Sequence, residues 1–175
     1  TDAPKTIHVW GVMEWCLWNA VDDANNYQRN LNIAESEVED GIIYHKTEYR
    51  ERRDHYAFYG VNVPAAGWDT DRNTFLGHMG DWSDPQLVRE ERSAFSKIVG
   101  WYPIGCQHLK VTLAPGESYR AVFTLGYGQN PRDQKFLSPG IIRKDTACRV
   151  LEKFSTDAAV DAALAELKAY WEGLL

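Results

Sequence analysis

Cysteine is scarce in this chain, and long apolar runs are missing from it. The three cysteines, Cys16, Cys106 and Cys148, are odd in number and show no C-x-x-C spacing. This pattern argues against a disulfide framework or a zinc knuckle and favours a reducing compartment, so we expect a cytoplasmic protein. No apolar stretch reaches membrane-spanning length and no secretory signal peptide is recognisable, so we expect no membrane partner.

Basic charge is also in deficit. The formal net charge is −6, with acids and bases interspersed along the chain. A chain of this kind is poorly suited to a nucleic-acid backbone or an anionic membrane surface. We therefore expect neither as a partner.

Motifs for metals, nucleotides and activated serine are missing as well. The histidines lack H-x-H or H-E-x-x-H spacing, no G-x-S-x-G elbow occurs, and no Walker or Rossmann glycine pattern is found. We therefore expect no metal and no cofactor. His45 and His55 read as strand histidines with backbone partners.

Aromatic residues, in contrast, are abundant. The 175 residues fit one domain, and 44% of them are hydrophobic, enough for a packed core. Seven Trp, nine Tyr and six Phe exceed what a core needs, and aromatic rings are also the platforms on which sugars stack. Trp15 is expected in the core, Trp18 beside a sugar, and Trp68 and Trp82 as loop anchors or a partner surface.

Alternating apolar residues and turn signals predict a mainly β protein, an antiparallel β-sandwich followed by C-terminal helices. Residues 6–18 are almost continuously apolar and read as a strand buried on both faces. Residues 109–113 and 119–127 are predicted to form a hairpin around the Pro115–Gly116 turn. Residues 64–93 read as loops with one helical turn near 85–91. The remaining strands are expected at 31–38, 42–47, 55–63 and 96–101.

Two helices are predicted at 145–154 and 158–175. Ser155 or Thr156 can cap the second helix, which carries an apolar stripe formed by Val160, Leu164, Leu167 and Trp171. No stop signal closes this helix, and residues 2–5 read as a turn between two strands. We therefore expect a longer polypeptide in which a further domain follows.

The stretch 14–30 is the main candidate for function. It begins as an apolar, aromatic strand and turns abruptly into a segment rich in amides and carboxylates, ending in Y-Q-R-N at 27–30. Forked amide and guanidinium groups beside aromatic rings suit a ligand with many hydroxyls. The alternative is an Asx-rich loop that satisfies its own backbone.

A second candidate is the charge cluster at 48–54. Its carboxylates, Glu48, Glu51 and Asp54, are the raw material of a glycosidase pair. The alternative is a solvated sheet edge whose arginines are the counter-charges.

Several long motifs resemble one known family. They are W-C-L-W-N-A at 15–20, N-Y-Q-R-N-L at 26–31, I-Y-H-K-T-E-Y-R-E-R-R-D-H-Y-A at 43–57, G-W-D-T-D-R at 67–72, G-W-Y-P-I-G at 100–105 and V-D-A-A-L at 160–164. They are spread along nearly the whole chain, which resembles the cellobiose phosphorylases of glycoside hydrolase family 94, the inverting disaccharide phosphorylases.

The resemblance implies an architecture and a reaction. Residues 1–140 would be part of an N-terminal β-sandwich and 141–175 the start of a helical linker. An (α/α)6 catalytic barrel elsewhere in the polypeptide would supply the catalytic acid and the phosphate pocket. The reaction would be reversible phosphorolysis of cellobiose to α-D-glucose 1-phosphate and glucose, with inorganic phosphate as co-substrate.

The resemblance also implies roles for this segment. It carries no catalytic residue, and Arg29, with Gln28, would contact the acceptor sugar. The sandwich would help to build a homodimer interface. Laminaribiose, cellobionate or cellodextrin specificity stays open, as does a stand-alone carbohydrate-binding β-domain.

Overall fold

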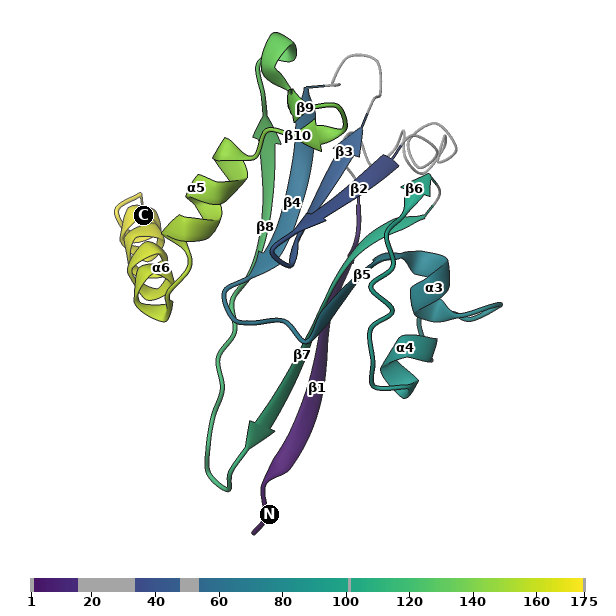
Figure 1. Ribbon diagram of the computed structural model, residues 1–175. Helices are drawn as coiled ribbons and strands as arrows, with labels where there is room; N and C mark the ends of the chain where they lie inside the picture. The colour runs from purple at the N-terminus through teal and green to yellow at the C-terminus, as the bar shows by residue number, and fades with distance from the viewer. Residues whose placement is uncertain (1, 16–33, 48–53, 101, 175) are drawn as a thin grey trace.

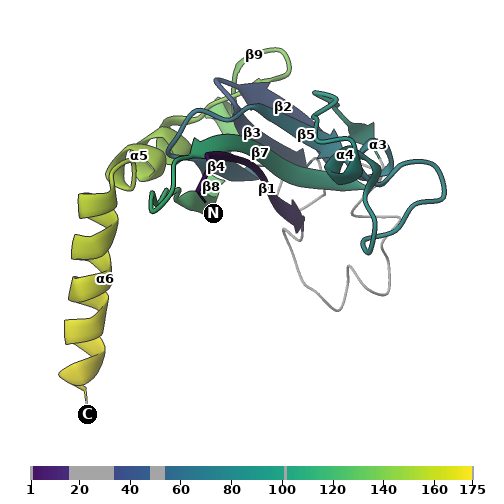
Figure 2. The ribbon, with the colours of Figure 1, turned by 90° about the horizontal axis from the view of Figure 1, so that it is seen from below.

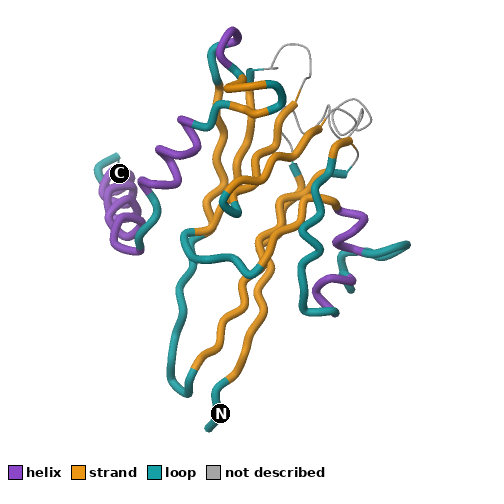
Figure 3. The backbone as a smooth tube through the Cα atoms, viewed as in Figure 1, coloured by secondary structure: helices purple, strands orange, loops and turns teal. Residues whose placement is uncertain are grey.

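The computed structural model describes residues 2–15, 34–47, 54–100 and 102–174. Within these residues the chain is mainly antiparallel sheet with helices at its C-terminal end (Figure 3), which confirms the predicted fold class. A three-stranded sheet and a five-stranded sheet face each other as a sandwich (Figure 1, Figure 2).

The smaller sheet has the order β1-β7-β5, with β1 at Lys5–Glu14, β7 at Pro103–Leu113 and β5 at Gly67–Asp71. The register of β1 against β7 runs from Lys5 opposite Leu113 to Glu14 opposite Ile104. Two short helices, α3 (Arg72–Leu76) and α4 (Gln86–Arg89), pack on its outer face. Their shared core consists of Phe75, Leu76, Leu87, Ile104 and Cys106.

The larger sheet has the order β6-β2-β3-β4-β8. Its strands are β6 (Val99–Gly100), β2 (Ala34–Glu39), β3 (Ile42–Thr47), β4 (His55–Val61) and β8 (Phe123–Gln129). Its outer face is covered by β9 (Phe136–Ser138), β10 (Ile141–Ile142) and α5 (Asp145–Lys153), and the short helix η2 (Arg132–Gln134) leads into β9. The core under this cover consists of Tyr44, Tyr56, Phe58, Ile142 and Ala147.

The layer between the sheets contains Trp15, Ile43, Ala57 and Tyr59. The sheets approach closely at Gly11, where a Cβ would lie 2.7 Å from the ring of Phe123. Gln107 bridges them by donating from Nε2 to the carbonyl oxygen of Gly41 at 2.7 Å. From Gly11 onward, the inner face of β1 therefore packs against the larger sheet.

The prediction that the first strand is buried on both faces was wrong. Ile7 and Val9 are 43% and 41% exposed, because the β1–β7 pair extends beyond the larger sheet toward the N-terminus (Figure 1). Only the last part of β1, at Gly11 and Met13, and Trp15 just beyond it reach the central layer.

The predicted hairpin around Gly116 was also wrong in its pairing. The turn is present, with Gly116 at φ 79° and the Glu117 N–H donating to the Ala114 carbonyl at 3.0 Å. However, β7 pairs with β1 and β5, and β8 pairs with β4 in the other sheet. The chain crosses between sheets here, and alternation within a strand does not specify its partner.

Residues 64–93 contain more structure than expected. The predicted helical turn is present as α4, but β5 and α3 are found in the same stretch. The strand β5 has no apolar alternation to reveal it. Its Asp69 and Thr70 are fully buried and bonded to residues 94–98 instead.

The second C-terminal helix, α6 (Asp157–Glu172), begins where expected, with Thr156 Oγ1 accepting from the Ala159 N–H at 3.2 Å. It projects away from the sandwich (Figure 2), and Leu164, Leu167 and Trp171 of its stripe are exposed. The domain boundary at 140/141 stays a prediction. No helix in the described ranges is both long enough and apolar enough to cross a membrane.

Candidate functional site

Several strand ends meet at the end of the sandwich farthest from the N-terminus, at the top of Figure 1. There β1 ends at Glu14 opposite Ile104 of β7, and Ala34 of β2 lies opposite Thr47 of β3 and Gly100 of β6. We call this the loop rim, because segments 16–33 and 48–53 connect to the fold here. Near it lie Glu14 and Trp15 at the end of β1, His45 stacked on Trp15, Asp54 and His55 where β4 begins, and Arg72 with Trp82 and Tyr102.

The sequence-predicted site residues Gln28 and Arg29 lie outside the described residues, as do Trp18, Glu48 and Glu51. Their roles stay predictions. What the structure describes is the surroundings from which segment 16–33 leaves the fold.

On one side of the β1 exit, Trp15 stacks on His45. The ring centroids are 5.1 Å apart with an interplanar angle of 8°, and Trp15 is buried, which confirms its predicted place in the core. The Nδ1 of His45 makes no hydrogen bond, so the expected backbone partner is not found at that atom. Burial lowers the pKa of His45 to about 3, so the ring stays neutral and apolar in character at neutral pH.

Asp54 directly precedes β4, which begins with His55 at the rim. The Asp54 carboxylate accepts from Gln129 Nε2 at 3.0 Å, and this hydrogen bond is the main cause that lowers the pKa of Asp54. His55 contacts the hydroxyl of Tyr127 through Nδ1. A catalytic acid needs a raised pKa, so Asp54 is unsuited to donate a proton.

On the other side of the β1 exit, Arg72 contacts three segments that are distant in sequence. Its Nε lies 3.0 Å from Oε1 of Glu14. Its guanidinium carbon lies 5.6 Å from the ring centroid of Trp82 and 5.5 Å from that of Tyr102. Sequence reasoning missed Arg72, although it ends the motif at 67–72, because that stretch was predicted as loop.

The two loop tryptophans both act as anchors. Trp82 packs at 5.9 Å from Phe75 as well as on Arg72, and Trp68 meets Phe95 edge-to-face at 5.6 Å. Of the two predicted roles, the loop anchor is therefore the one with contacts in this structure.

Behind the rim, the buried carboxylate of Asp69 holds residues 94–98 against β5. It accepts from the backbone of Ala94 at 3.2 Å and from the backbone and hydroxyl of Ser96 at 3.0 and 2.8 Å. Burial raises the pKa of Asp69, but the side chain is fully enclosed and its oxygens are occupied by these donors. It is a structural group.

A histidine pair lies on the face of β1 and β7 that carries α3 and α4. His8 Nδ1 and His108 Nε2 are 2.8 Å apart, and the ring of His108 stacks on Trp10 at 4.5 Å. Ser93 Oγ lies 3.2 Å from His108 Nδ1, which ties the loop after α4 to β7. Burial lowers the pKa of His108, which favours the neutral form of its ring.

A buried network of charges joins the larger sheet to the segment that leads into the helices. Lys46 contacts Glu35 at 2.9 Å, Glu37 at 3.5 Å and the Gly140 carbonyl at 2.6 Å. Glu37 also pairs with Lys144 and accepts from the backbone N–H of Ile142 at 3.1 Å. These contacts fasten β10 and the start of α5 to β2 and β3.

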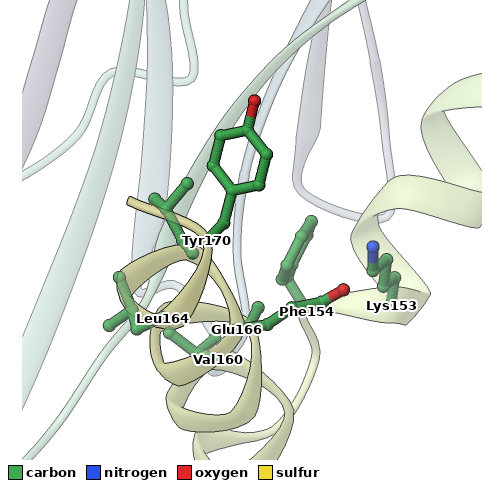
Figure 4. Close-up of a pocket in the computed structure, with 8 residues that line it drawn as sticks. Lys153, Phe154, Val160, Leu164, Glu166 and Tyr170 are labelled. Atoms are coloured by element: carbon green, nitrogen blue, oxygen red, sulfur yellow. The ribbon is translucent and has the colours of Figure 1, made fainter. Parts of the chain in front are cut away.

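Two hollows accompany these features. A groove of about 520 Å³ runs between the end of α5 and α6, and its lining is mostly apolar (Figure 4). A smaller hollow of about 370 Å³ lies at the β2–β3 turn beside Trp68 and Gln107. The first is lined by Lys153, Phe154, Val160, Ala163, Leu164, Glu166, Leu167 and Tyr170. Among the described residues, no cluster of three or more His, Cys, Asp or Glu side chains could hold a metal.

Comparison of the sequence with protein-family profiles assigns this chain to a family. The profile described as "Glycosyl hydrolase 94, supersandwich domain" matches residues 1–156. The chain belongs to the glycosyl hydrolase 94 family. This confirms the family resemblance drawn from the motifs, and the supersandwich agrees with the two facing sheets.

Relatives in this family are longer proteins. The chain is 27% identical over 174 residues to an N,N'-diacetylchitobiose phosphorylase from Vibrio furnissii, matching 98% of this chain and 20% of that protein. The protein of the same name from Vibrio proteolyticus matches to the same extent. A solabiose phosphorylase from Paenibacillus borealis is 29% identical over 175 residues, 93% of this chain and 22% of that protein. The chain thus spans about a fifth of the relatives' length. None of these three relatives is named for cellobiose, so the cellobiose part of the resemblance stays a prediction.

Proposed function

We propose that the chain is the supersandwich part of an inverting disaccharide phosphorylase. The observation that carries this proposal is the family match over residues 1–156, together with relatives that are phosphorylases. In the proposed reaction an oxygen of inorganic phosphate attacks the anomeric carbon of the disaccharide. The glycosidic bond breaks, the leaving sugar oxygen receives a proton, and the products are an α-sugar 1-phosphate and a free sugar.

The proton donor and the phosphate pocket are proposed to lie outside this chain. Of the described carboxylates considered above, Asp54 is kept ionised by Gln129 and Asp69 is sealed in the core. Neither is suited to donate a proton to a sugar. The proposed contribution of this chain is therefore acceptor binding.

Arg29, with Gln28, is the proposed contact to the acceptor sugar. Support comes from the loop rim, which gathers the ends of segment 16–33 beside a guanidinium and several aromatic rings. Arginine offers a planar fork of donors to neighbouring hydroxyls, which lysine cannot reproduce.

Arg29→Lys tests this assignment in the full-length protein. We expect the KM for the acceptor sugar, measured in the synthetic direction, to rise. The KM for phosphate, measured in phosphorolysis, should stay nearly unchanged. An equal rise of both constants would count against the assignment.

The reaction itself is tested with the full-length protein and a panel of disaccharides. Cellobiose is the substrate first proposed from the motifs, and N,N'-diacetylchitobiose and solabiose are added because they name the substrates of the relatives. We expect phosphate-dependent release of an α-sugar 1-phosphate from at least one of them, detected by ³¹P NMR. Sugar binding without any phosphorolysis would favour the stand-alone carbohydrate-binding domain instead.

Three further properties belong to the proposal. The enzyme is expected to need no cofactor beyond phosphate as co-substrate, to be cytoplasmic, and to form a homodimer to which the sandwich contributes. The chain spans about a fifth of the relatives' length. The main partner proposed for this segment is therefore the rest of its own polypeptide. Light scattering of the full-length protein measures the dimer directly.

A further inference from the structure

The hollow at the β2–β3 turn combines aromatic and polar walls. Its volume is about 370 Å³, and it lies at the opposite end of these two strands from the loop rim. Both sheets contribute to its lining: Ile42 and Val61 belong to the larger sheet, and Trp68 and Gln107 belong to the smaller one. Small-molecule sites in proteins usually have volumes of about 300–1,000 Å³, so this hollow has room for a small ligand.

The aromatic wall consists of Trp68 and Phe95, which meet edge-to-face with their ring centroids 5.6 Å apart. Phe95 is 55% exposed and has φ 55°, a left-handed backbone conformation that is uncommon for an aromatic residue. The buried Asp69 carboxylate accepts from the backbone N–H groups of Ala94 at 3.2 Å and Ser96 at 3.0 Å. These two donors flank Phe95, so Asp69 holds its backbone in this conformation. Unfavourable backbone conformations of this kind are concentrated at functional sites.

The side chain of Gln107 brings an amide to the hollow. Its Nε2 donates to the carbonyl oxygens of Gly41 at 2.7 Å and Tyr59 at 3.4 Å, and these two acceptors fix the orientation of the amide. The side chain is fully buried, and its Oε1 has no hydrogen-bond partner among the described residues. Because buried amide oxygens normally accept a hydrogen bond, this atom indicates a donor that comes from outside the chain. The hollow that Gln107 lines is where such a donor can approach.

The charge of the lining restricts the class of ligand. Asp40, which is exposed in the β2–β3 turn, is the one charged residue among the described residues that line the hollow. An anion such as a sugar phosphate would therefore find no cation to pair with here. A neutral pyranose suits this lining better. Its hydroxyls can donate to the carboxylate of Asp40 and to Oε1 of Gln107, and its C–H face can pack on an aromatic ring.

We propose that this hollow binds a neutral pyranose ring, with Trp68 and Phe95 as its aromatic wall and Asp40 and Gln107 as hydrogen-bond acceptors. The inference goes beyond the proposed function and does not depend on the role proposed for Arg29. The ring could belong to a free monosaccharide or to the end of an oligosaccharide, because both present the same C–H face and the same hydroxyls.

Amide hydrogen exchange in the full-length protein, followed by mass spectrometry, tests the site directly. The probes are D-glucose, D-galactose, N-acetyl-D-glucosamine and cellobiose. We expect at least one of these sugars to slow exchange in the peptides that cover residues 39–43 and 61–68, and to do so in a saturable manner. Slower exchange with cellobiose alone would support a site for the end of an oligosaccharide. Sorbitol, a polyol without a pyranose ring, controls for the general effect of concentrated polyols and should not protect these peptides.

Two variants test the two kinds of wall. Phe95→Ala should raise the sugar concentration at half-protection by about fivefold to tenfold. Asp40→Asn should raise it by a smaller factor, because an amide oxygen still accepts a hydrogen bond but carries no charge. Asn-Gly is also a favoured pair for a two-residue hairpin turn, so this change preserves the turn. Tyr119→Ala is the matched control: the ring is 47% exposed but does not line the hollow, so the half-protection concentration should stay unchanged.

Thermal unfolding identifies any variant that fails to fold, in which case Asp40→Asn, the milder change, decides. The inference is overturned if none of the sugars protects these peptides, or if sorbitol protects them equally. An unchanged half-protection concentration in both variants would also overturn it. Protection by tetramethylammonium chloride in place of the sugars would indicate a cation site and refute the proposal. None of these measurements requires phosphorolysis, so this inference and the proposed function can fail independently.

Discussion

His45 shows how one side chain can give the fold a pH dependence. It is buried against Trp15, its Nδ1 has no partner, and its pKa is lowered to about 3. An unfolded histidine titrates near pH 6.5. Between these values the unfolded chain binds a proton that the folded chain does not, so stability falls as pH drops below about 6.5.

We predict that His45→Phe, which keeps the ring stack and removes the titration, flattens this dependence. Lowering the pH from 7.0 to 5.5 should cost the wild type about 1 kcal/mol more than the variant. Thermal unfolding at the two pH values measures the difference. Some dependence will remain, because burial lowers the pKa of His108 as well. His78→Gln, at an exposed position, is the control, and equal slopes for wild type and His45→Phe would refute the prediction.

At the scale of the residue, sequence reasoning placed Trp15 correctly because a large aromatic in an apolar run has few other places to go. It did not find Arg72, because the partners of this side chain come from residues 14, 82 and 102. No local pattern brings these positions together. Contacts between residues so far apart in sequence depend on the order of the strands in the sheet. The alternation of apolar residues within one strand does not predict that order.

At the scale of the element, the pairing of β8 with β4 depends on which residues of the two strands lie opposite each other, and the sequence pattern of β8 alone does not show this. Gly126 lies directly opposite Phe58 and Gly128 opposite Tyr56. A Cβ at Gly126 would overlap the Phe58 ring, and one at Gly128 would lie 2.7 Å from the Tyr56 ring. The two glycines make room for the two rings, so β8 is matched to β4. The strands β3 and β4 were predicted well because their β-branched and aromatic residues are local signals for a strand.

We predict that Gly126→Ala destabilises the fold by about 1–3 kcal/mol, because the added methyl group must displace a fully buried ring. Gly173→Ala is the matched control. Gly173 has φ −77°, and its nearest neighbours to an added Cβ are at 3.4 Å or beyond, so the change should be neutral or slightly stabilising. Chemical denaturation of the two variants compares them, and similar stabilities would contradict this account of the pairing.

At the scale of the whole molecule, several large apolar side chains among the described residues are exposed. Ile7 and Val9 on β1, Leu125 on β8, and Leu164 and Leu167 on α6 are all exposed. In the described part of the chain, β1 and β8 are also edge strands of their sheets. Contiguous apolar surface and free strand edges promote association.

We predict that the 175-residue chain, expressed alone, associates in a concentration-dependent manner. The double substitution Leu164→Ser and Leu167→Ser should reduce this association, because it removes apolar lining from the α5–α6 groove. Sedimentation velocity at several concentrations measures the effect. If the chain remains monomeric at high micromolar concentration, the prediction that these exposed apolar surfaces drive association is wrong.

Glu37 has a consequence for how this sequence can diverge. Its carboxylate serves Lys46 and Lys144 together, and both ammonium groups are buried, whereas their other acidic partners, Glu35 and Glu39, are largely open to water. Losing the shared acid would leave two desolvated cations with weaker compensation, which is far more costly than losing a surface charge. Mutational drift at position 37 is therefore tolerable only when both lysines are replaced as well, so these three sites should evolve as one unit.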